Sequence, residues 1–288
     1  MMNKTSQALA AAILGTSMAG ATAAADEVTI GWTAWSDAEF ITKLAAEILE
    51  GHGGYDVDLT QTDIAPQYQG LASGDIDAML MSWQPGTHGD YLDEIAGEYT
   101  DLGPLYTRAR LGWVVPDYIP EDELSSIEDL RDDEVREKLG GEITGIDPGA
   151  GLSGLSEDAM EDYGLDDYNL QFSSGAGMTA ALERAIGRDE WIVVTGWSPH
   201  WKFGAYELRY LEDPEGSLGG AERIHALTRN GFHEDQPEVA EFFARMYVPL
   251  EMLQEYMAYA EDNSYDEAVQ KFIDEQPERV NYWLNDEF

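Results

Sequence analysis

The sequence has 288 residues, of which 57 are Asp or Glu and only 16 are Lys or Arg, so its formal net charge is −41. Hydrophobic residues make up 43% and aromatic residues 11%, which is enough for a large core and excludes a disordered acidic tail. The absence of cysteine excludes disulfides, Cys-based metal sites and a cysteine nucleophile. Nucleic acid is excluded as a partner, because phosphate binding needs a basic surface.

The first 25 residues have the pattern of a secretory signal peptide. Lys4 precedes the apolar run Ala8–Gly15, and the small residues Ala23–Ala25 follow. The apolar run is too short to span a bilayer of about 30 Å. We therefore expect residues 1–25 to be removed. Because no cysteine follows that could carry a lipid, we expect a freely diffusing periplasmic monomer without a lipid anchor.

The acidic residues are dispersed over the expected helix faces and are not gathered in one block. A net charge of −41 makes the chain repel itself at low salt. At about 1 M salt the Debye length falls to ~3 Å, so most of that repulsion disappears. The composition therefore indicates a protein that works in high external salt.

Strand patterns alternate with helix patterns in the first block of the expected mature chain. A strand at Val28–Trp32 precedes a helix that Asp37 can cap and that runs to about His52. The elements expected next are a strand (Tyr55–Thr60), a helix (Tyr68–Ser73) and a strand (Ala78–Ser82). Strands that alternate with helices predict a largely parallel α/β sheet.

A second block of the same kind follows. Its expected strands are Leu111–Val115, Ile143–Ile146, Leu170–Ser173 and Ile192–Thr195. Its expected helices are Asp132–Leu139, Gly154–Tyr163 and Met178–Ile186. After Tyr210 the pattern is mainly helical. Two such blocks without a flexible linker predict an α/β fold of two lobes, residues 26–110 plus 212–288 and residues 111–211, with a ligand cleft between them.

Tryptophan follows three of the expected strands, in loops that should face the cleft: Trp35 (with Trp32 close by), Trp83 and Trp197. Indole faces attract a cation that lies within ~6 Å of the ring centre. A quaternary ammonium group has no N–H to donate, so an aromatic cage can select it where hydrogen bonds cannot. The tryptophans that we expect in the core instead are Trp113 and Trp191, within strands, and Trp283 on the last helix.

Two features could bind an anion near these tryptophans. The glycine-rich turn Gly145–Gly151 leads into a helix, and its free N–H groups suit a small carboxylate, although a plain tight turn is the alternative. No lysine follows the glycines, which excludes a nucleotide P-loop. His88 lies five residues after Trp83 and can donate a hydrogen bond to a carboxylate. His200 is the rival histidine, which we expect to hold its own loop.

Three segments, together with the Trp83–His88 loop, resemble the substrate-binding proteins of ABC transporters for glycine betaine and proline betaine. The segments are ITGIDPGAGL at Ile143–Leu152, VTGWSPHWKF at Val194–Phe203 and YELRYLEDPEG at Tyr206–Gly216. The resemblance covers nearly the whole mature chain and implies a type II periplasmic-binding fold that closes on its solute. Some members are circularly permuted and begin with the half that contains Gly-Ile-Asp-Pro-Gly, which comes second here.

The resemblance also implies which residues bind the ligand. It implies a prism of three indoles around the trimethylammonium group, formed by Trp35, Trp83 and Trp197, with Trp32 as the alternative to Trp35. The ligand's carboxylate would be held by two backbone amides and a histidine, those of Gly145, Ile146 and His88. Trp35, Trp83 and His88 belong to one expected lobe, and the other implied residues belong to the second. Only closure of the lobes would therefore complete the site.

The function that the resemblance implies is that of the periplasmic component of an ABC importer. It would capture glycine betaine or a similar zwitterion and deliver it to the inner-membrane permease for osmoprotection, without enzyme activity, metal or cofactor. Choline, carnitine, proline betaine and sulfonium analogues are the alternative ligands, of which choline lacks the carboxylate. A secreted hydrolase built on Ser198, His200 and Asp213 is a remote alternative, because the chain lacks a G-x-S-x-G motif. A metal carrier is disfavoured by the scattered histidines and the missing cysteine.

Overall fold

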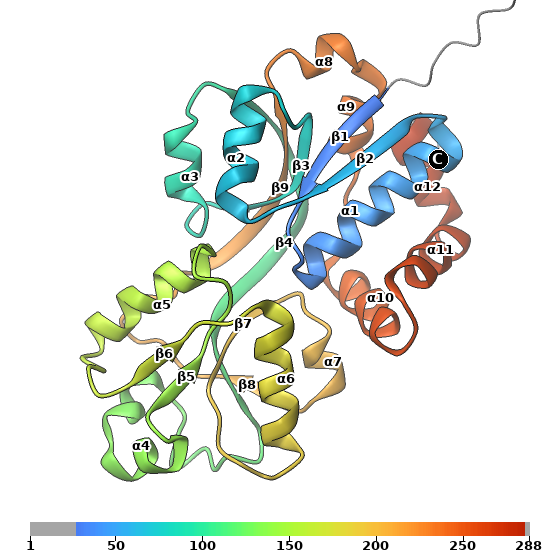
Figure 1. The fold of residues 1–288 in the computed structure, drawn as a ribbon. Helices are drawn as coiled ribbons and strands as arrows, with labels where there is room; N and C mark the ends of the chain where they lie inside the picture. The colour runs from blue at the N-terminus through green and yellow to red at the C-terminus, as the bar shows by residue number, and fades with distance from the viewer. Residues whose placement is uncertain (1–26, 286–288) are drawn as a thin grey trace, which may run out of the picture.

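A computed structural model describes residues 27–285 of the chain. The predicted signal peptide, residues 1–25, lies outside the described residues. Two lobes are visible in Figure 1, joined by long strands that run between them. We call the upper one the first lobe, with β1–β3, β9, α1–α3 and α8–α12, and the lower one the second lobe, with β5–β8 and α4–α7. The predicted two-lobe α/β fold is therefore confirmed.

The strands are β1 (Glu27–Trp32), β2 (Asp56–Gln61), β3 (Ala78–Gln84), β4 (Tyr99–Pro116), β5 (Glu142–Thr144), β6 (Asn169–Gln171), β7 (Val194–Ser198), β8 (Leu208–Tyr210) and β9 (Ala221–Arg229). The helices of the first lobe are α1 (Ser36–Ile48), α2 (Ile64–Ser73), α3 (Gly89–Glu94), α8 (Phe232–Asp235), α9 (Pro237–Arg245), α10 (Leu250–Asp262), α11 (Tyr265–Glu275) and α12 (Pro277–Asn285). Those of the second lobe are α4 (Asp133–Leu139), α5 (Gly151–Asp162), α6 (Gly175–Ile186) and α7 (Lys202–Ala205). A π-helical turn (Leu49–Gly53) extends α1, and a 3₁₀ turn (Ile127–Arg131) precedes α4.

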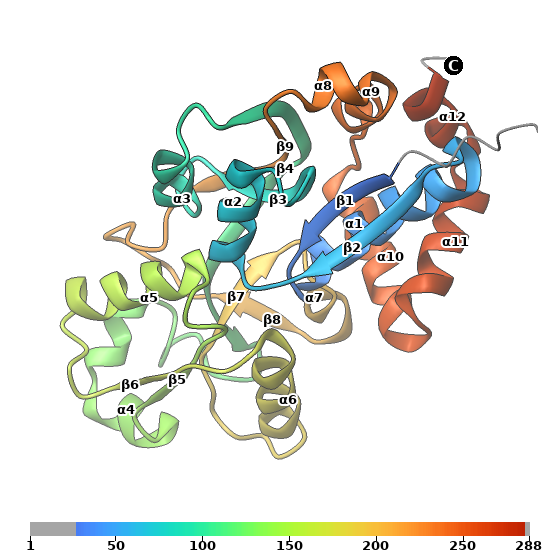
Figure 2. The ribbon, with the colours of Figure 1, turned by 45° about the horizontal axis from the view of Figure 1, so that its top comes forward.

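The strands form one nine-stranded sheet in the order β2-β1-β3-β9-β4-β7-β5-β6, with β8 beside β4. Pairing is parallel within β2-β1-β3 and within β7-β5-β6, where helices connect the strands. The central strands β9 and β4 are antiparallel to each other and to their outer neighbours. The expected largely parallel sheet is thus mixed, because the chain crosses between the lobes twice in opposite directions (Figure 2).

Strand β4 joins the two halves of the sheet. Its residues up to Arg110 pair with β9, and from Arg110 to Val114 they pair with β7. Arg110 itself is opposite both Ala221 and Ser198. One extended strand therefore belongs to both lobes. The lobe limits proposed from the sequence stay a prediction, because a single continuous strand carries the first crossing.

Sequence reasoning missed β9 and the first half of β4. Ala221–Arg229 contains Ala, Glu and Arg, which favour helices, and lies among helical patterns, yet its buried and exposed residues largely alternate. The first half of β4 contains Gly103 and Pro104, which are rare in strand interiors. Other elements have limits that differ from the expected ones; for example, β7 ends at Ser198 rather than Thr195, and α5 begins at Gly151 rather than Gly154.

The core tryptophans were predicted correctly in two of three cases. Trp113 is fully buried on β4 and donates its indole N–H to Ser156 Oγ at 3.0 Å. Trp283 on α12 stacks on Phe272 at 5.8 Å between ring centroids. Trp191 precedes β7 and is only partly buried, with Lys138 Nζ 4.4 Å from its ring centroid, so its predicted place within a strand is wrong. Within residues 27–285 no helix is both long and apolar enough to cross a membrane.

Candidate ligand-binding site

A small pocket lies between the two lobes. Residues of the first lobe, of β4 and of the second lobe line it: Trp35, Trp83, Thr87, His88, Leu111, Ile146, Ala150, Gly151, Leu152 and Trp197. Five of the six predicted ligand-binding residues are in this set, and Gly145 is not. The side chains that face the pocket are mostly apolar and aromatic, so a ligand inside would be shielded from water.

The three predicted cage tryptophans come from three different elements. Trp35 directly precedes α1, Trp83 is the last residue but one of β3, and Trp197 is the last but one of β7. The expectation that all three lie in loops is wrong for Trp83 and Trp197, because β3 and β7 extend two to three residues beyond their predicted ends. Each ring is at most 7% exposed. Trp32, the alternative to Trp35, does not line the pocket.

The two lobes are in direct contact around the pocket. Three hydrogen bonds between lobes are Trp35 Nε1 to Asp147 Oδ2 (3.1 Å), Trp197 Nε1 to Asp37 Oδ1 (2.8 Å) and Tyr91 Oη to the Gly149 carbonyl oxygen (2.7 Å). Gly151 of the second lobe lies so close to Thr87 of the first that a Cβ atom would be 2.2 Å from the Thr87 carbonyl oxygen. The structure is therefore the closed form.

His88 is held as a neutral hydrogen-bond donor. The backbone N–H of Trp83 donates to the ring Nδ1 of His88 at 3.1 Å, and the backbone N–H of His88 donates to the Trp83 carbonyl oxygen at 3.0 Å. Because Nδ1 accepts, the ring proton of the neutral form is on Nε2. Burial lowers the pKa of His88 to about 3, so the ring stays neutral at any ordinary pH. Its Nε2–H can donate to an anion in the pocket without adding a charge.

Glu222 on β9 fixes the loop that carries His88. Its Oε1 accepts the N–H groups of Gly86 and Thr87 at 3.1 and 3.2 Å. The carboxyl group is almost fully buried, and desolvation raises its pKa. Sequence reasoning missed this role, because β9 itself was not predicted.

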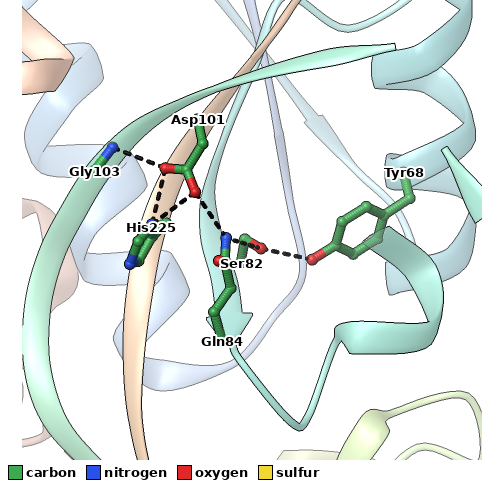
Figure 3. Close-up of polar contacts among 6 residues, drawn as sticks. All are labelled: Tyr68, Ser82, Gln84, Asp101, Gly103 and His225. Atoms are coloured by element: carbon green, nitrogen blue, oxygen red, sulfur yellow. Dashed lines mark hydrogen bonds and ion pairs between the residues drawn. The ribbon is translucent and has the colours of Figure 1, made fainter. Parts of the chain in front are cut away.

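Tyr68 packs against His88, with 5.7 Å between the ring centroids. It also belongs to the polar network drawn in Figure 3. The Tyr68 hydroxyl donates to Ser82 Oγ at 2.9 Å, and Gln84 Nε2 contacts both Ser82 Oγ and Asp101 Oδ2 at 3.3 Å. His225 Nδ1 lies 2.8 and 2.9 Å from the two carboxylate oxygens of Asp101. This network ties α2, β3, β4 and β9 together and makes the wall behind His88 rigid.

The predicted anion donors differ in their availability. The Gly145 N–H donates to the Gln171 carbonyl oxygen at 2.8 Å, so it is not free for a ligand in this structure. The Ile146 N–H has no acceptor among the described residues, and Ile146 lines the pocket. Gly151 and Leu152 also line it, and their N–H groups belong to the first turn of α5, where helical acceptors are missing. The part of Gly145 in anion binding stays a prediction.

Asp37 has a different place from the one predicted. Helix α1 begins at Ser36 with Trp35 as the capping residue, so Asp37 lies inside the first turn and is fully buried. It accepts hydrogen bonds from Tyr106 Oη at 2.6 Å and from the indole of Trp197. Desolvation raises its pKa, although these bonds oppose the shift. The signal in the sequence was a carboxylate on the otherwise apolar face of an amphipathic helix.

Lys202 and His200 pack against Trp197, and neither of them lines the pocket. Lys202 is fully buried, its Nζ lies 4.4 Å from the Trp197 ring centroid, and it has no hydrogen-bond partner among the described residues. Burial lowers the pKa of Lys202 to about 7, against an opposing effect of the Asp37 carboxylate. His200 Nδ1 accepts the Lys202 N–H at 3.1 Å, which confirms that His200 holds its own loop.

Replacing Lys202 with Met should change how stability depends on pH. Between pH about 7 and 10 the unfolded chain binds the Lys202 proton and the folded chain does not, so wild-type stability rises with pH by ~1.4 kcal/mol per unit from this group. The Lys202→Met variant lacks this rise. We expect it to be more stable than wild type at pH 7, with a difference that shrinks towards pH 9.5. Urea unfolding at both pH values measures it, and a constant difference would contradict the shifted pKa.

The three residues of the remote hydrolase alternative form hydrogen bonds with other residues and not with one another. Ser198 Oγ is hydrogen-bonded to Tyr210 Oη at 2.8 Å, and Asp213 accepts the Tyr163 hydroxyl at 2.5 Å. His200 uses its Nδ1 for the Lys202 N–H. These contacts do not form a serine–histidine–aspartate triad. Over residues 27–285, no group of three or more His, Cys, Asp or Glu side chains could hold a metal ion.

Fold and pocket together define a two-lobe solute-binding protein with an aromatic-lined pocket between its lobes. The family described as the substrate-binding domain of ABC-type glycine betaine transport systems matches residues 26–275. The chain belongs to this family. Its members are binding components of transport systems rather than enzymes, in agreement with the expectation from the sequence.

Several proteins of this kind are similar to the chain. The glycine betaine/carnitine transport binding protein GbuC of Listeria monocytogenes is 39% identical over 184 residues, which are 63% of this chain and 58% of that protein. The closed structure of lactococcal OpuAC with glycine betaine has a TM-score of 0.84 at 32% identity, over 90% of this chain and 100% of the other. The ProX protein of Borrelia burgdorferi has a TM-score of 0.83 at 31% identity, over 90% and 97%.

Proposed function

We propose that this protein captures glycine betaine between its lobes as the solute-binding component of an ABC importer for osmoprotection. The observation that carries the proposal is the pocket itself, in which Trp35, Trp83 and Trp197 from both lobes meet beside the neutral donor His88. The indoles would enclose the trimethylammonium group. His88 Nε2–H, the Ile146 N–H and the first turn of α5 would bind the carboxylate.

The energetics favour a zwitterion with a methylated head. A cation–π contact contributes ~1–2 kcal/mol when it is shielded from water. Three such contacts and charge-assisted hydrogen bonds support affinity in the micromolar range, about −8 kcal/mol, after the costs of ordering. Glycine betaine has no net charge, so a protein with a formal charge of −41 does not repel it.

Closure links capture to delivery. Trp35, Trp83 and His88 belong to the first lobe, while Ile146 and Trp197 belong to the second, so only the closed form offers the ligand every group at once. The ligand then stabilises the closed form by its extra affinity for it. We propose that the closed surface is what an inner-membrane permease recognises. The periplasmic location and monomeric state predicted from the sequence fit this role, and the OusX relative from Dickeya dadantii, 22% identical, is described as periplasmic.

Isothermal titration with a ligand panel tests the proposed ligand. The panel consists of glycine betaine, proline betaine, carnitine, choline and ectoine, and carnitine is included because the Listeria relative is named for it. We expect micromolar binding of glycine betaine and weaker binding of choline, which has the onium head but no carboxylate. If glycine betaine releases no heat of binding, or if choline binds more tightly, the proposed ligand is wrong.

Replacing His88 with Ala should affect ligands according to their anionic end. The variant loses one hydrogen bond to a charged group, which corresponds to about tenfold weaker binding of glycine betaine or more. Choline, which offers no carboxylate to Nε2, should lose much less. Calorimetry of both ligands with both proteins measures the difference. Equal losses would mean that His88 does not contact the carboxylate.

We also propose that the protein is adapted to high salt. The acidic surface has few cations to balance it, since 57 acidic residues face 16 Lys and Arg. We expect the midpoint of thermal unfolding to be several degrees higher in about 1 M KCl than in 0.05 M KCl, because screening removes self-repulsion. Sucrose of equal osmolality is the control, since it does not screen charge. A midpoint that is unchanged by salt would contradict the adaptation.

A further inference from the structure

Two tryptophans of the cage have a second contact, which crosses to the opposite lobe. Trp35 of the first lobe donates its indole N–H to Asp147 Oδ2 of the second lobe at 3.1 Å. Trp197 of the second lobe donates its indole N–H to Asp37 Oδ1 of the first lobe at 2.8 Å. The arrangement is reciprocal, since each lobe supplies one indole and one carboxylate. We call these two hydrogen bonds the latches.

The Asp37 latch is deeply buried. The carboxylate is fully inaccessible in the closed form, and Tyr106 Oη donates to its other oxygen at 2.6 Å. The ring of Trp197 also packs against His200, at 4.6 Å between ring centroids, and against Lys202. Trp197 therefore has a single orientation, and its N–H has no acceptor other than Asp37 among the described residues.

The Asp147 latch joins the cage to the loop that carries the anion donors. Asp147 directly follows Ile146, a residue that lines the pocket and whose N–H has no acceptor among the described residues. The carboxylate of Asp147 is partly exposed, so this latch should be weaker than the buried one. Through this bond the second lobe holds the Trp35 ring of the first lobe at the pocket.

Both latches can exist only when the lobes are closed. Opening separates each indole from its carboxylate, and water then hydrates both groups. The hydrogen bond from the indole N–H also stops the ring from rotating about its Cβ–Cγ bond. The ring face towards the pocket is therefore fixed before the ligand's methyl groups contact it. A carboxylate at the N–H edge further makes the ring face more negative, which strengthens its attraction for a cation.

We propose that Asp37 and Asp147 are positioning residues, which hold the cage tryptophans of the opposite lobe and so make cage assembly and lobe closure one event. The proposal rests on the proposed function, because it assigns the tryptophans to a ligand cage. It goes beyond that function by assigning a role in binding to two acidic residues that do not line the pocket.

Double-mutant cycles test the latches by titration calorimetry. The substitutions are Asp37→Asn with Trp197→Phe, and Asp147→Asn with Trp35→Phe, where Phe keeps an aromatic face and loses the N–H. We expect each single change to weaken ligand binding by about tenfold. Within a latch, the affinity of the double variant for the ligand should be nearly the same as that of the single variant with the lower affinity. If the two effects multiply within both latches, the proposal is overturned.

Two controls are a double variant that combines residues of different latches and a variant that removes a hydrogen bond outside the latches. Asp37→Asn with Trp35→Phe joins residues of different latches, so their effects should multiply. Tyr91→Phe removes a bond between lobes that involves no cage residue, and its small effect should multiply with every other change. Stopped-flow kinetics should show that the latch variants change the dissociation rate and leave the association rate nearly unchanged. A loss confined to the association rate would also contradict the latches.

The panel titration separates failure of the latches from failure of the proposed ligand. If wild-type protein binds another member of the panel and not glycine betaine, the proposed ligand is wrong. The cycles are then run with the ligand that does bind, and they still decide the latches. If glycine betaine binds and all cycles are multiplicative, only the latches are wrong.

Discussion

The Trp197→Ala variant should bind glycine betaine roughly 100-fold more weakly than the wild-type protein. Its indole would supply one cation–π contact, worth ~1–2 kcal/mol, and it donates a hydrogen bond to the buried Asp37 carboxylate, worth ~1.5–3 kcal/mol. The sum corresponds to about two powers of ten in affinity when part of it is recovered by water. Calorimetric titration measures the loss.

Two further measurements make the result for Trp197 specific. Circular dichroism and thermal unfolding establish that the variant is folded at the titration temperature, since a buried indole also contributes to stability. Trp197→Phe keeps an aromatic face and should recover part of the affinity. If Trp197→Ala binds as tightly as wild type while it is folded, the indole is not part of the cage.

The second large effect is expected for Gly151→Ala, a change that adds a single methyl group. In the closed form the new Cβ would be 2.2 Å from the carbonyl oxygen and 2.7 Å from Cγ2 of Thr87 in the opposite lobe. Backbone atoms cannot yield by that much, so the lobes cannot close completely. We expect binding to weaken by about 100-fold, through faster dissociation, while the open form folds normally.

The chain offers a matched control for this change on the same helix. Gly154 lies one turn further along α5, and a Cβ there would meet no atom within 4 Å. Gly154→Ala should therefore bind glycine betaine as wild type does, with equal or slightly higher stability, because Ala is a better helix former. Equal affinity of the Gly151→Ala variant and wild type would mean that complete closure is not needed for binding.

Much of the site could be predicted because its residues stand at the ends of strands. Within each lobe, parallel strands place their carboxyl ends at one edge, and the edges of two facing lobes line a shared cleft. Trp83 and Trp197 could therefore be assigned to the same cleft although 114 positions separate them in the numbering. The same reasoning separated Trp113, which lies within a strand and is buried in the core. Chemistry then restricted the ligand, since indoles select an onium group and a neutral histidine suits a carboxylate.

The supporting residues could not be predicted, because their partners are distant in sequence. Glu222 holds the loop of His88 from β9, a strand that propensity assigned to the helical part of the chain. The pairing of the Gly145 N–H with Gln171 depends on the register of β5 against β6. Neither contact leaves a local pattern in the sequence, since local patterns report periodicity and turn chemistry only.

Residue types and their order by themselves determined that this chain forms two α/β lobes and presents indoles and a histidine at strand ends, because burial of alternating apolar faces leaves few other arrangements. Only the tertiary structure decided that Asp37 is a buried acceptor for Trp197 rather than a helix cap, and that Trp35 rather than Trp32 faces the pocket. A capping carboxylate and a buried carboxylate inside the first turn look alike in sequence. The tertiary contact distinguishes them, since here Trp197 of the other lobe donates a hydrogen bond to the Asp37 carboxylate.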